Sequence, residues 1–563
     1  MLKFLTFSLL GTLFNGVVWA QSRGVFIPLN AEYYHLIERY EIRSGQFGSG
    51  FHGQVKPYRR RDVVQLAERV EVDPALPRSE ADRFNLQYLQ NDSWEWAIDT
   101  LAATSRRPLL KTFYRKKADF FSTRNDDFEV HLNPVFYGST GLGDDVPNGG
   151  YVNTRGIEVR GSVGKKLGFY SYLADNQLRM PGYFTDRVKA TNALPNEGFY
   201  KTYRGDSSTY DFYTVRGYVT FDPLRQLNVQ FGHDKVFIGT GLRSVILSDF
   251  SSPFLFLKAT TQLGPVQYQN LFAEIINNQI PGLPYGELAP KKFLAFHHLS
   301  VNIGKHVNVG VFEAVVHSRG KDQGYFDLRY LNPVIFYRAI EGEKNSPDNV
   351  LLGLDFRANI LRRFSLYGQL MLDEFKFDEA FNGKGWWGNK VAAQAGLKYI
   401  DVLGIRNLDL QGEFNLARPY TYQHLSDRTN YVAYNQPLAH PLGANFVEFT
   451  GVARYQPLPR LNLTATYVAA QSGANRNGQN WGNNPLEPYT TRILDYGNRI
   501  TQGQKTNLTL LDAVVSYQVK HNVFVDVRHL RRFQDATGDR FDRNTVFTSV
   551  ALRINIAQRG LAF

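Results

Sequence analysis

The chain of 563 residues contains 64 Lys and Arg against 52 Asp and Glu, 14% aromatic residues and no cysteine. The lack of cysteine excludes a disulfide framework and lipid attachment at a cysteine. The formal net charge of +12 suits anionic glycans or lipid headgroups, although a spread of charge over solvated surfaces is the simpler explanation.

Residues 1–20 have the pattern of a secretory signal peptide. Lys3 gives the positive start, an uncharged apolar run follows, and Val18-Trp-Ala20 supplies small residues for a signal peptidase. The apolar run is short for a spanning helix, and no later stretch approaches roughly 18 consecutive apolar residues. The sequence therefore predicts export with cleavage after Ala20, which makes Gln21 the mature N-terminus. An exported chain of this kind is expected to have no nucleic-acid partner.

Residues 21–125 are predicted to form a mainly helical periplasmic region. Apolar side chains recur at helical spacing in two stretches, for which we expect helices over 58–70 and 80–97. Ser79-Glu-Ala-Asp82 resembles a capping box before the second of them, and Asn30 can cap a further helix. These amphipathic helices are expected below the barrel, on the side of its short turns.

From residue 126 to 563 the period of the apolar residues changes to two. In 352–360 every even residue is apolar, while the odd residues include Asp355, Arg357 and Asn359. Most of the alternating runs have 9–14 residues, longer than the roughly 5–6 of soluble sheets and long enough for the roughly 9–11 that cross a bilayer. The runs cover residues 127–139, 150–163, 165–177, 209–222, 226–234, 253–262, 264–278, 291–304, 306–317, 349–360, 363–374, 387–400, 405–418, 442–456, 459–472, 506–519, 522–533 and 545–557.

Short and long connections alternate, for the most part, between these runs. Turns such as Gly304-Lys305 alternate with the long segments 178–208, 318–348, 419–441 and 473–505. This asymmetry is typical of an outer-membrane barrel with short periplasmic turns and long external loops. The predicted fold is an all-β membrane protein, an 18-stranded antiparallel up-and-down transmembrane β-barrel surrounded by outer-membrane lipid, with both chain ends in the periplasm. The terminal Phe563 suits recognition by the outer-membrane barrel assembly machinery.

Charges of both signs fall on the polar side of the predicted strands. They predict a salt-bridged, well-filled lumen, and we expect no catalytic residue, cofactor or metal ligand there. The neighbours His297 and His298 should point to opposite faces of their strand and cannot share a metal ion. The inward charges are Glu158, Arg160, Arg216, Asp355, Arg357, Asp373, Lys398, Asp409, Glu413, Asp512, Asp526, Arg528 and Arg553.

Aromatic residues gather in the predicted external loops. Aromatic faces beside Arg, Asn and Asp suit stacking on sugar rings, although an interface girdle would explain many of them. We expect the loops 375–386 and 419–441 to meet and to bind polysaccharide through Trp386, Trp387, Arg418, Tyr420 and Tyr422. The further loop aromatics are Tyr183, Phe184, Phe199, Tyr200, Tyr203, Tyr431, Tyr434, Trp481 and Tyr489.

Several motifs spread over the chain resemble the Wzi-like family of capsule-assembly outer-membrane proteins, particularly its larger branch associated with exopolysaccharide and gliding systems. The resemblance implies an eighteen-stranded barrel, a helical periplasmic part that closes its inner mouth, and a lectin-like role in organising exported polysaccharide. The motifs are Tyr33-Tyr-His-Leu36, Lys56-Pro-Tyr-Arg59, Asn153-Thr-Arg-Gly-Ile-Glu-Val-Arg-Gly161, Phe231-Gly-His-Asp234, Arg243-Ser-Val-Ile-Leu-Ser-Asp249, Tyr330-Leu-Asn-Pro333, Ser346-Pro-Asp-Asn349, Gly412-Glu-Phe-Asn415 and Ala439-His-Pro-Leu-Gly443.

Three functions follow from these features. The first is a non-enzymatic barrel that binds or organises surface polysaccharide in capsule or exopolysaccharide assembly. The second is an accessory component of a gliding-motility or secretion apparatus, which would have motility or export proteins as partners. The third is a diffusion pore, which would require an open channel through the barrel.

Overall fold

The computed structural model describes residues 24–29, 31–48, 51–164, 166–277, 288–319, 324–333, 336–337, 346–537 and 542–561. The predicted signal peptide, its cleavage site, Asn30 and Phe563 lie outside the described residues. Among the described residues, no helix is long and apolar enough to cross a membrane.

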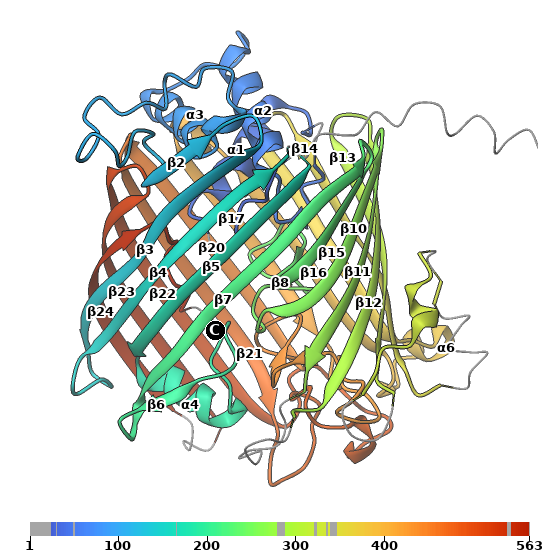
Figure 1. The fold of residues 1–563 in the computed structure, drawn as a ribbon. Helices are drawn as coiled ribbons and strands as arrows, with labels where there is room; N and C mark the ends of the chain where they lie inside the picture. Colours follow the sequence, from blue (N-terminus) through green and yellow to red (C-terminus); the bar gives the residue numbers. More distant parts are fainter. Residues whose placement is uncertain are drawn as a thin grey trace, which may run out of the picture.

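Within this part of the chain, eighteen antiparallel strands close into a barrel, and the last strand pairs with the first (Figure 1). Each predicted run coincides with one strand, so the predicted order and number are confirmed. The strands are β3 (Phe128–Gly143), β4 (Gly150–Val163), β5 (Leu167–Arg179), β7 (Asp206–Leu224), β8 (Leu227–Asp234), β10 (Phe254–Leu263), β11 (Val266–Ile276), β12 (Lys291–Ile303), β13 (Val307–His317), β14 (Asn349–Ile360), β15 (Phe364–Glu374), β16 (Lys390–Tyr399), β17 (Leu408–Ala417), β20 (Phe446–Leu458), β21 (Leu461–Ala474), β22 (Gln504–Lys520), β23 (Val523–Ala536) and β24 (Arg543–Ile554).

Short strands extend this wall or join the segments inside it. β2 (Phe121–Arg124) pairs with β3 beyond the end of β24, and β6 (Lys201–Tyr203) pairs with β7. The remaining short pairs are β1 (Val55–Lys56) with β9 (Phe237–Ile238) and β18 (Val432–Ala433) with β19 (Gln436–Pro437).

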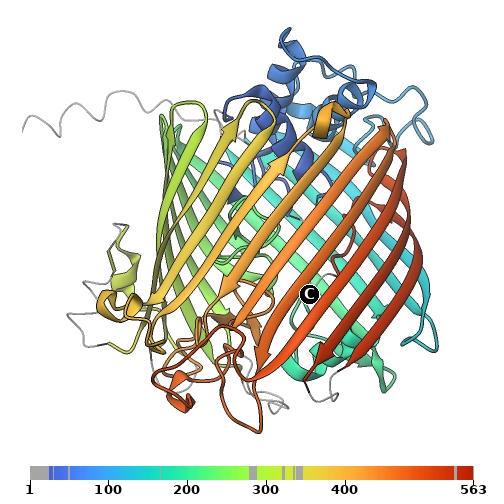
Figure 2. The same cartoon turned by 180° about the vertical axis from the view of Figure 1, so that it is seen from behind.

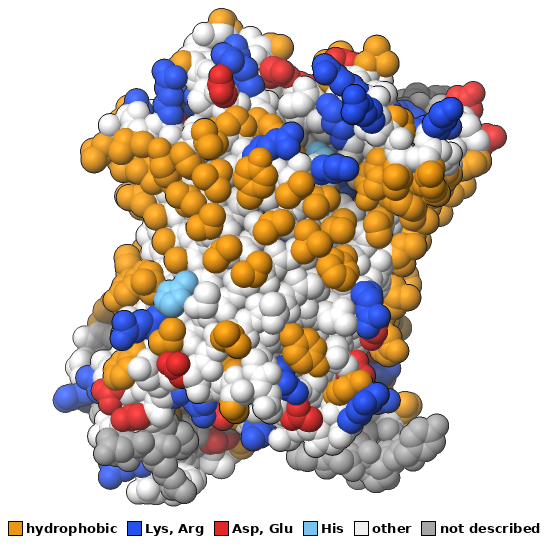
Figure 3. Space-filling view, turned by 90° about the vertical axis from the view of Figure 1, so that its left-hand side faces the viewer, with side chains coloured by type: hydrophobic (Ala, Val, Ile, Leu, Met, Phe, Trp, Pro, Cys, Tyr) orange, Lys and Arg blue, Asp and Glu red, His pale blue; other side chains and the backbone are white. Residues whose placement is uncertain are grey.

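The alternation of side chains sets the two faces of the wall. Leu354 is 41% exposed on the outer face, whereas its neighbour Asp355 is 1% exposed and faces the lumen. Hydrophobic side chains cover much of the wall, and charged side chains gather near its two ends (Figure 3). This pattern is the one that a bilayer requires, with an apolar band between two polar ends.

The N-terminal helices lie at the end of the barrel that carries the short turns (Figures 1 and 2). They are α1 (Tyr34–Ser44), α2 (Arg60–Val72) and α3 (Glu80–Asp92), followed by the 3₁₀ turn η1 (Trp94–Trp96). The helices predicted over 58–70 and 80–97 are confirmed, although the second ends earlier than expected, before Ser93. The long loops at the other end contain α4 (Gly182–Thr191), α6 (Phe377–Ala380), η2 (Leu328–Leu331) and η4 (Tyr489–Thr491), and η3 (Val402–Gly404) lies in a turn at the helical end.

Ser79 caps α3 as the sequence predicts. Its Oγ accepts a hydrogen bond from the Asp82 N–H at 3.0 Å, and Asp82 Oδ2 accepts one from the Ser79 N–H at 2.9 Å. Replacing Ser79 by alanine should lower the free energy of unfolding by about 1 kcal/mol, because the Asp82 N–H at the start of the helix loses its acceptor. A urea titration followed by tryptophan fluorescence measures this change. Ser79→Asp should retain most of the stability, and an unchanged midpoint in the alanine variant would contradict the cap.

The chain turns back into the barrel after β24. Leu561 is buried, its carbonyl accepts a hydrogen bond from Tyr183 Oη at 3.0 Å, and the Arg559 carbonyl accepts one from Arg528 Nη1 at 2.8 Å. β24 ends on the helical side, and the tail up to residue 561 folds inward because Leu561 packs in an apolar cluster with Tyr183 and Phe184. The predicted periplasmic position of the C-terminus stays a prediction.

Candidate functional site

Three long loops interlock at the end of the barrel opposite the helices, and we call them the rim loops. The Trp387 N–H donates to the Asp495 carbonyl at 2.9 Å, and Lys390 Nζ donates to the Gln423 carbonyl at 2.9 Å. The segment 375–389 therefore meets the segment 475–503, and Lys390, the first residue of β16, contacts the segment 418–445. That the loops 375–386 and 419–441 meet stays a prediction. The rim loops are the β15–β16 loop (375–389), the β17–β20 loop (418–445) and the β21–β22 loop (475–503).

Aromatic rings form a row across these loops, which we call the aromatic row. The ring centroids of Trp386 and Trp387 are 5.8 Å apart, and those of Trp387 and Tyr489 are 4.8 Å apart. The Arg492 guanidinium carbon lies 4.1 Å from the Trp387 centroid, and Lys376 Nζ lies 4.8 Å from that of Trp386. All three rings are half-buried, so neighbouring loops hold them in place while part of each remains accessible.

Tyr420 and Tyr422 do not present a free ring. Both side chains are fully buried, and their hydroxyls donate to the carbonyls of Asn480 at 3.3 Å and Val245 at 2.8 Å. Tyr422 also stacks on Tyr431, with centroids 5.9 Å apart. The prediction that these two rings are exposed for stacking is wrong. The rim loops pack on one another, and both rings are buried between them.

Burial at the same rim lowers the pKa values of Arg418 and His424. Arg418 is half-buried and donates from Nε to the Asn389 carbonyl at 2.8 Å, and burial lowers the pKa of its guanidinium. Burial, with the nearby charge of Lys390, lowers the pKa of His424 to about 3. His424 is therefore a neutral imidazole near neutral pH, and the cations of the site come from arginine and lysine.

The sequence did not separate accessible loop aromatics from buried ones. Tyr183 and Phe184 are buried, whereas Phe199 is exposed. Arg492 and Lys376 were not predicted either, because the sequence does not indicate which aromatic ring a loop cation will contact. The aromatic content of the loops was the signal that pointed to this end of the barrel.

The helices close the other end of the barrel through buried ion pairs. Arg39 of α1 contacts Asp409 and donates to Asp401 at 2.6 Å. Glu38 lies between Lys56, at 2.7 Å, and Lys398 of β16. Burial opposes ionisation of Glu38, but the charges of Lys398 and Lys56 hold its pKa well below the usual value. We call residues 24–96, which include these helices, the plug.

Two further pairs tie α1 and the segment before it to distant strands. Glu41 pairs with Arg357 of β14, and each side chain is 1% exposed. Glu32 Oε2 lies 2.8 Å from Arg553 Nη1 of β24. The plug is therefore bound to opposite parts of the barrel wall by two ion pairs, of which the pair between Glu41 and Arg357 is fully buried and the Glu32 carboxylate is partly exposed.

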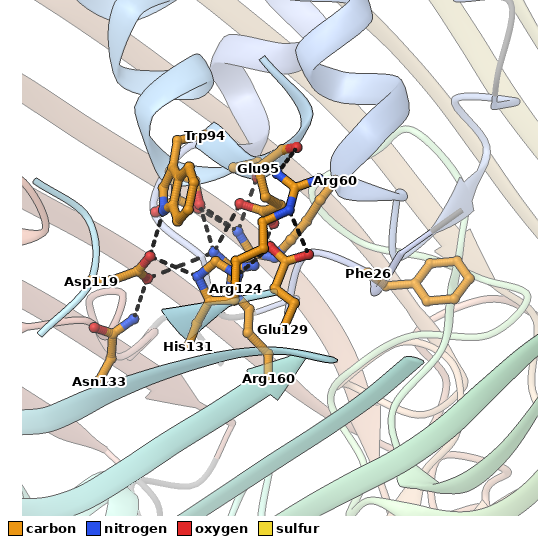
Figure 4. A network of polar contacts seen from close by, with 12 residues as sticks. Phe26, Arg60, Trp94, Glu95, Asp119, Arg124, Glu129, His131, Asn133 and Arg160 are labelled. Carbon is orange, nitrogen blue, oxygen red and sulfur yellow. Dashed lines mark hydrogen bonds and ion pairs between the residues drawn. The ribbon is translucent and has the colours of Figure 1, made fainter. Parts of the chain in front are cut away.

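A network of polar contacts joins η1 to the wall close to β2 (Figure 4). Asp119 accepts a hydrogen bond from Trp94 Nε1 at 2.6 Å, and its carboxylate lies 2.7 Å from His131 Nδ1 and 3.7 Å from Arg160. Burial opposes ionisation of Asp119, but His131 and Arg160 hold its pKa below the usual value. The charge of this carboxylate is thus balanced within the network.

Glu95, Glu129 and His131 bring three ligand atoms within 4.8 Å of one another, a group that the sequence did not indicate. His131 Nε2 lies 2.8 Å from Glu129 Oε1, and its other ring nitrogen faces Asp119. Arg160 contacts Glu95. Because an arginine and both histidine nitrogens already satisfy these carboxylates, the arrangement fits an ion-pair network better than a metal centre.

The inward charges predicted from the sequence are all buried or half-buried in the barrel. Arg528 Nε donates to Asp512 at 2.7 Å, and Lys390 Nζ donates to Asp373 at 3.1 Å. The predicted salt-bridged interior is confirmed, since acids and bases of neighbouring strands neutralise one another.

The histidine pair on β12 also follows the prediction. His298 Nε2 lies 2.6 Å from Asp355 Oδ2 in the lumen, whereas His297 Nδ1 lies 2.8 Å from the hydroxyl of Tyr268. Adjacent residues of a strand point to opposite faces, so the two imidazoles have separate partners.

A cavity of about 330 Å³ remains in the lumen between the plug and the rim loops. Four cations line it together with the acids Glu197 and Asp249, and the Glu197 carboxylate is 3.8 Å from Arg216. The C-terminal tail forms one of its walls. The lining cations are Arg216, Lys235, Arg243 and Arg559.

Comparison with known proteins agrees with this architecture. The model of the family described as capsule assembly protein Wzi matches residues 151–529. The solved structure of Wzi from Escherichia coli, described as an outer-membrane protein involved in group 1 capsule assembly and a carbohydrate-binding β-barrel, has a TM-score of 0.56 and 13% identity, covering 95% of this chain and 100% of that chain. No curated protein sequence matches the chain.

Two barrels from Pseudomonas aeruginosa are less similar. OprD has a TM-score of 0.41 and 9% identity, covering 76% of this chain and 93% of its own. OpdL has a TM-score of 0.39 and 10% identity, covering 76% of this chain and 98% of its own.

Proposed function

Because the chain belongs to the Wzi capsule assembly family, whose model matches most of the barrel, we propose that it is a non-enzymatic outer-membrane barrel that binds exported surface polysaccharide at its rim loops. The similar Escherichia coli protein is described as a carbohydrate-binding barrel, which supports the same class of ligand. The observation that carries the proposal is the aromatic row with its adjoining cations.

The aromatic row has the chemistry that a sugar chain needs. Flat, fixed rings stack on the apolar faces of sugar rings, and the Arg492 guanidinium beside Trp387 can pair with the carboxylate of an acidic sugar. Trp386 and Trp387 thus remain candidate ligands, whereas Arg418, Tyr420 and Tyr422 support the rim loops from below. The proposed binding surface is Trp386, Trp387, Tyr489 and Arg492.

The plug argues against the diffusion pore, because its helices and ion pairs occupy one end of the lumen. We propose that residues 1–20 direct export, that residues 21–125 face the periplasm and that the barrel assembly machinery inserts residues 126–563. The alternation of short turns and long loops supports this orientation. The accessory role in a gliding or secretion apparatus stays a prediction.

Trp387→Ala is expected to weaken binding of the cell's own exopolysaccharide roughly tenfold, about 1.4 kcal/mol, because the variant loses a stacking face. Biolayer interferometry on folded, immobilised barrels measures the affinity. Phe199→Ala is the matched control, since Phe199 is an exposed loop aromatic outside the aromatic row. Equal affinities of the wild type and Trp387→Ala would remove the row from consideration.

A further inference from the structure

The segment between η1 and β2, residues 97–120, projects beyond the outline of the barrel at the helical end (Figures 1 and 2). We call it the basic loop. It has two acids, Asp99 and Asp119, and Asp119 is buried in the network of Figure 4. Its six cations are Arg106, Arg107, Lys111, Arg115, Lys116 and Lys117.

Most of this positive charge faces solvent. Arg106, Arg107, Lys111, Arg115 and Lys117 are exposed, and none of the five forms an ion pair within the part of the chain that the structure describes. The cations of the plug behave differently, since they are buried against carboxylates. The basic loop therefore concentrates positive charge, with Asp99 as its one exposed acid among the described residues.

Exposed aliphatic side chains lie among these cations. Ile98, Leu101, Leu109 and Leu110 are between 54% and 89% exposed. The loop nevertheless has a fixed conformation. The Leu109 N–H donates to the Phe113 carbonyl at 2.8 Å, and the Phe113 N–H donates to the Leu109 carbonyl at 2.9 Å. Its tip thus holds two leucines outward beside basic residues.

The position of the loop relative to the membrane follows from the wall. The loop ends at Phe120, and the next residue, Phe121, is an exposed aromatic on β2. Phe128 at the start of β3 is also exposed. Since β2 pairs with β3 at the helical end of the wall, these aromatics mark the edge of the apolar band. The C-terminal end of the basic loop therefore joins the wall at this edge of the band, near the level of the lipid headgroups.

We propose that the basic loop is a membrane-surface anchor: its cations pair with the phosphates of anionic phospholipids in the leaflet at the helical end, and Leu109 and Leu110 insert between the headgroups. Basic residues with exposed aliphatic neighbours are the combination that binds such interfaces. An acidic partner protein would also attract the cations. The overhang beside the apolar band favours lipid, because it brings the leucines against a bilayer that is always present. The proposal does not depend on polysaccharide binding.

A single label can test the anchor, because the chain has no cysteine. Leu110→Cys would carry an environment-sensitive nitrobenzoxadiazole dye, and the folded barrel would be placed in nanodiscs of phosphatidylcholine alone or with phosphatidylglycerol. We expect blue-shifted emission and quenching by headgroup spin-labelled lipid, both larger with phosphatidylglycerol. Gln65→Cys is the matched control, since Gln65 is an exposed residue on α2 at the same end.

A second variant tests the role of charge. Arg106→Gln, Arg107→Gln and Lys111→Gln combined with Leu110→Cys should abolish the difference between the two bilayers, while heat-modifiable gel migration confirms a folded barrel. The anchor is overturned if the label at 110 is no more quenched than the label at 65, which is the result that an acidic protein partner predicts. Quenching that is equal in both bilayers would overturn the assignment to anionic headgroups.

Discussion

Arg357→Met should lower the free energy of unfolding by about 3–5 kcal/mol, because it leaves the Glu41 carboxylate buried without its partner. Glu41 is 1% exposed, and the hydrogen bond that it accepts from the Gly48 N–H at 3.0 Å cannot replace a full charge. Urea unfolding of the refolded barrel in detergent, followed by tryptophan fluorescence, measures the difference.

The double variant Arg357→Met/Glu41→Leu separates the lost pair from the lost packing. Replacing both charges by apolar groups removes the unpaired carboxylate, so most of the stability should return. Arg83→Met on the exposed face of α3 is the control for the substitution itself. A single Arg357 variant as stable as this control would show that the pair does not hold the plug.

Tyr422→Ala should lower the free energy of unfolding by about 3–5 kcal/mol, because it empties a fully buried site beneath the rim loops. If the Tyr422→Ala variant also binds less glycan, the rim loops should be loosened as well, and limited proteolysis detects this. Trp387→Ala should instead weaken binding while the unfolding midpoint changes little.

Tyr422→Phe provides the conservative counterpart. It keeps the ring that packs against Tyr431 and loses only the hydrogen bond to the Val245 carbonyl, which contributes about 1 kcal/mol. This variant should bind polysaccharide normally. Normal stability in Tyr422→Ala together with lost binding would restore Tyr422 as a direct ligand.

The strands could be predicted because each one has one face toward the apolar band and one toward the polar lumen, so its side chains must alternate. Their ends were less predictable, since alternation continues into the loops. The runs expected at 387–400 and 405–418 correspond to strands over Lys390–Tyr399 and Leu408–Ala417, so Trp387 and Arg418 belong to loops. The capping box at Ser79 was predictable because its partners are three residues apart.

The burial of Tyr420 and Tyr422 could not be predicted for a physical reason. The acceptor for the Tyr422 hydroxyl lies 177 residues away along the chain, in a segment inside the barrel. Loop composition reports which residues are available for a site, whereas the packing of one loop on another decides which rings face solvent. The inward course of the tail after β24 depends on similarly distant partners.

The pair between Glu32 and Arg553 also constrains the order of biogenesis. The two residues are 521 positions apart, and Arg553 lies on the strand that is synthesised last. The helical segment precedes every barrel strand in the chain, yet its partners on β14, β16 and β24 do not exist as a surface until those strands have assembled. Docking of the first segment in the chain must therefore wait for the last strand, and until then its amphipathic helices lack the barrel surface that covers them.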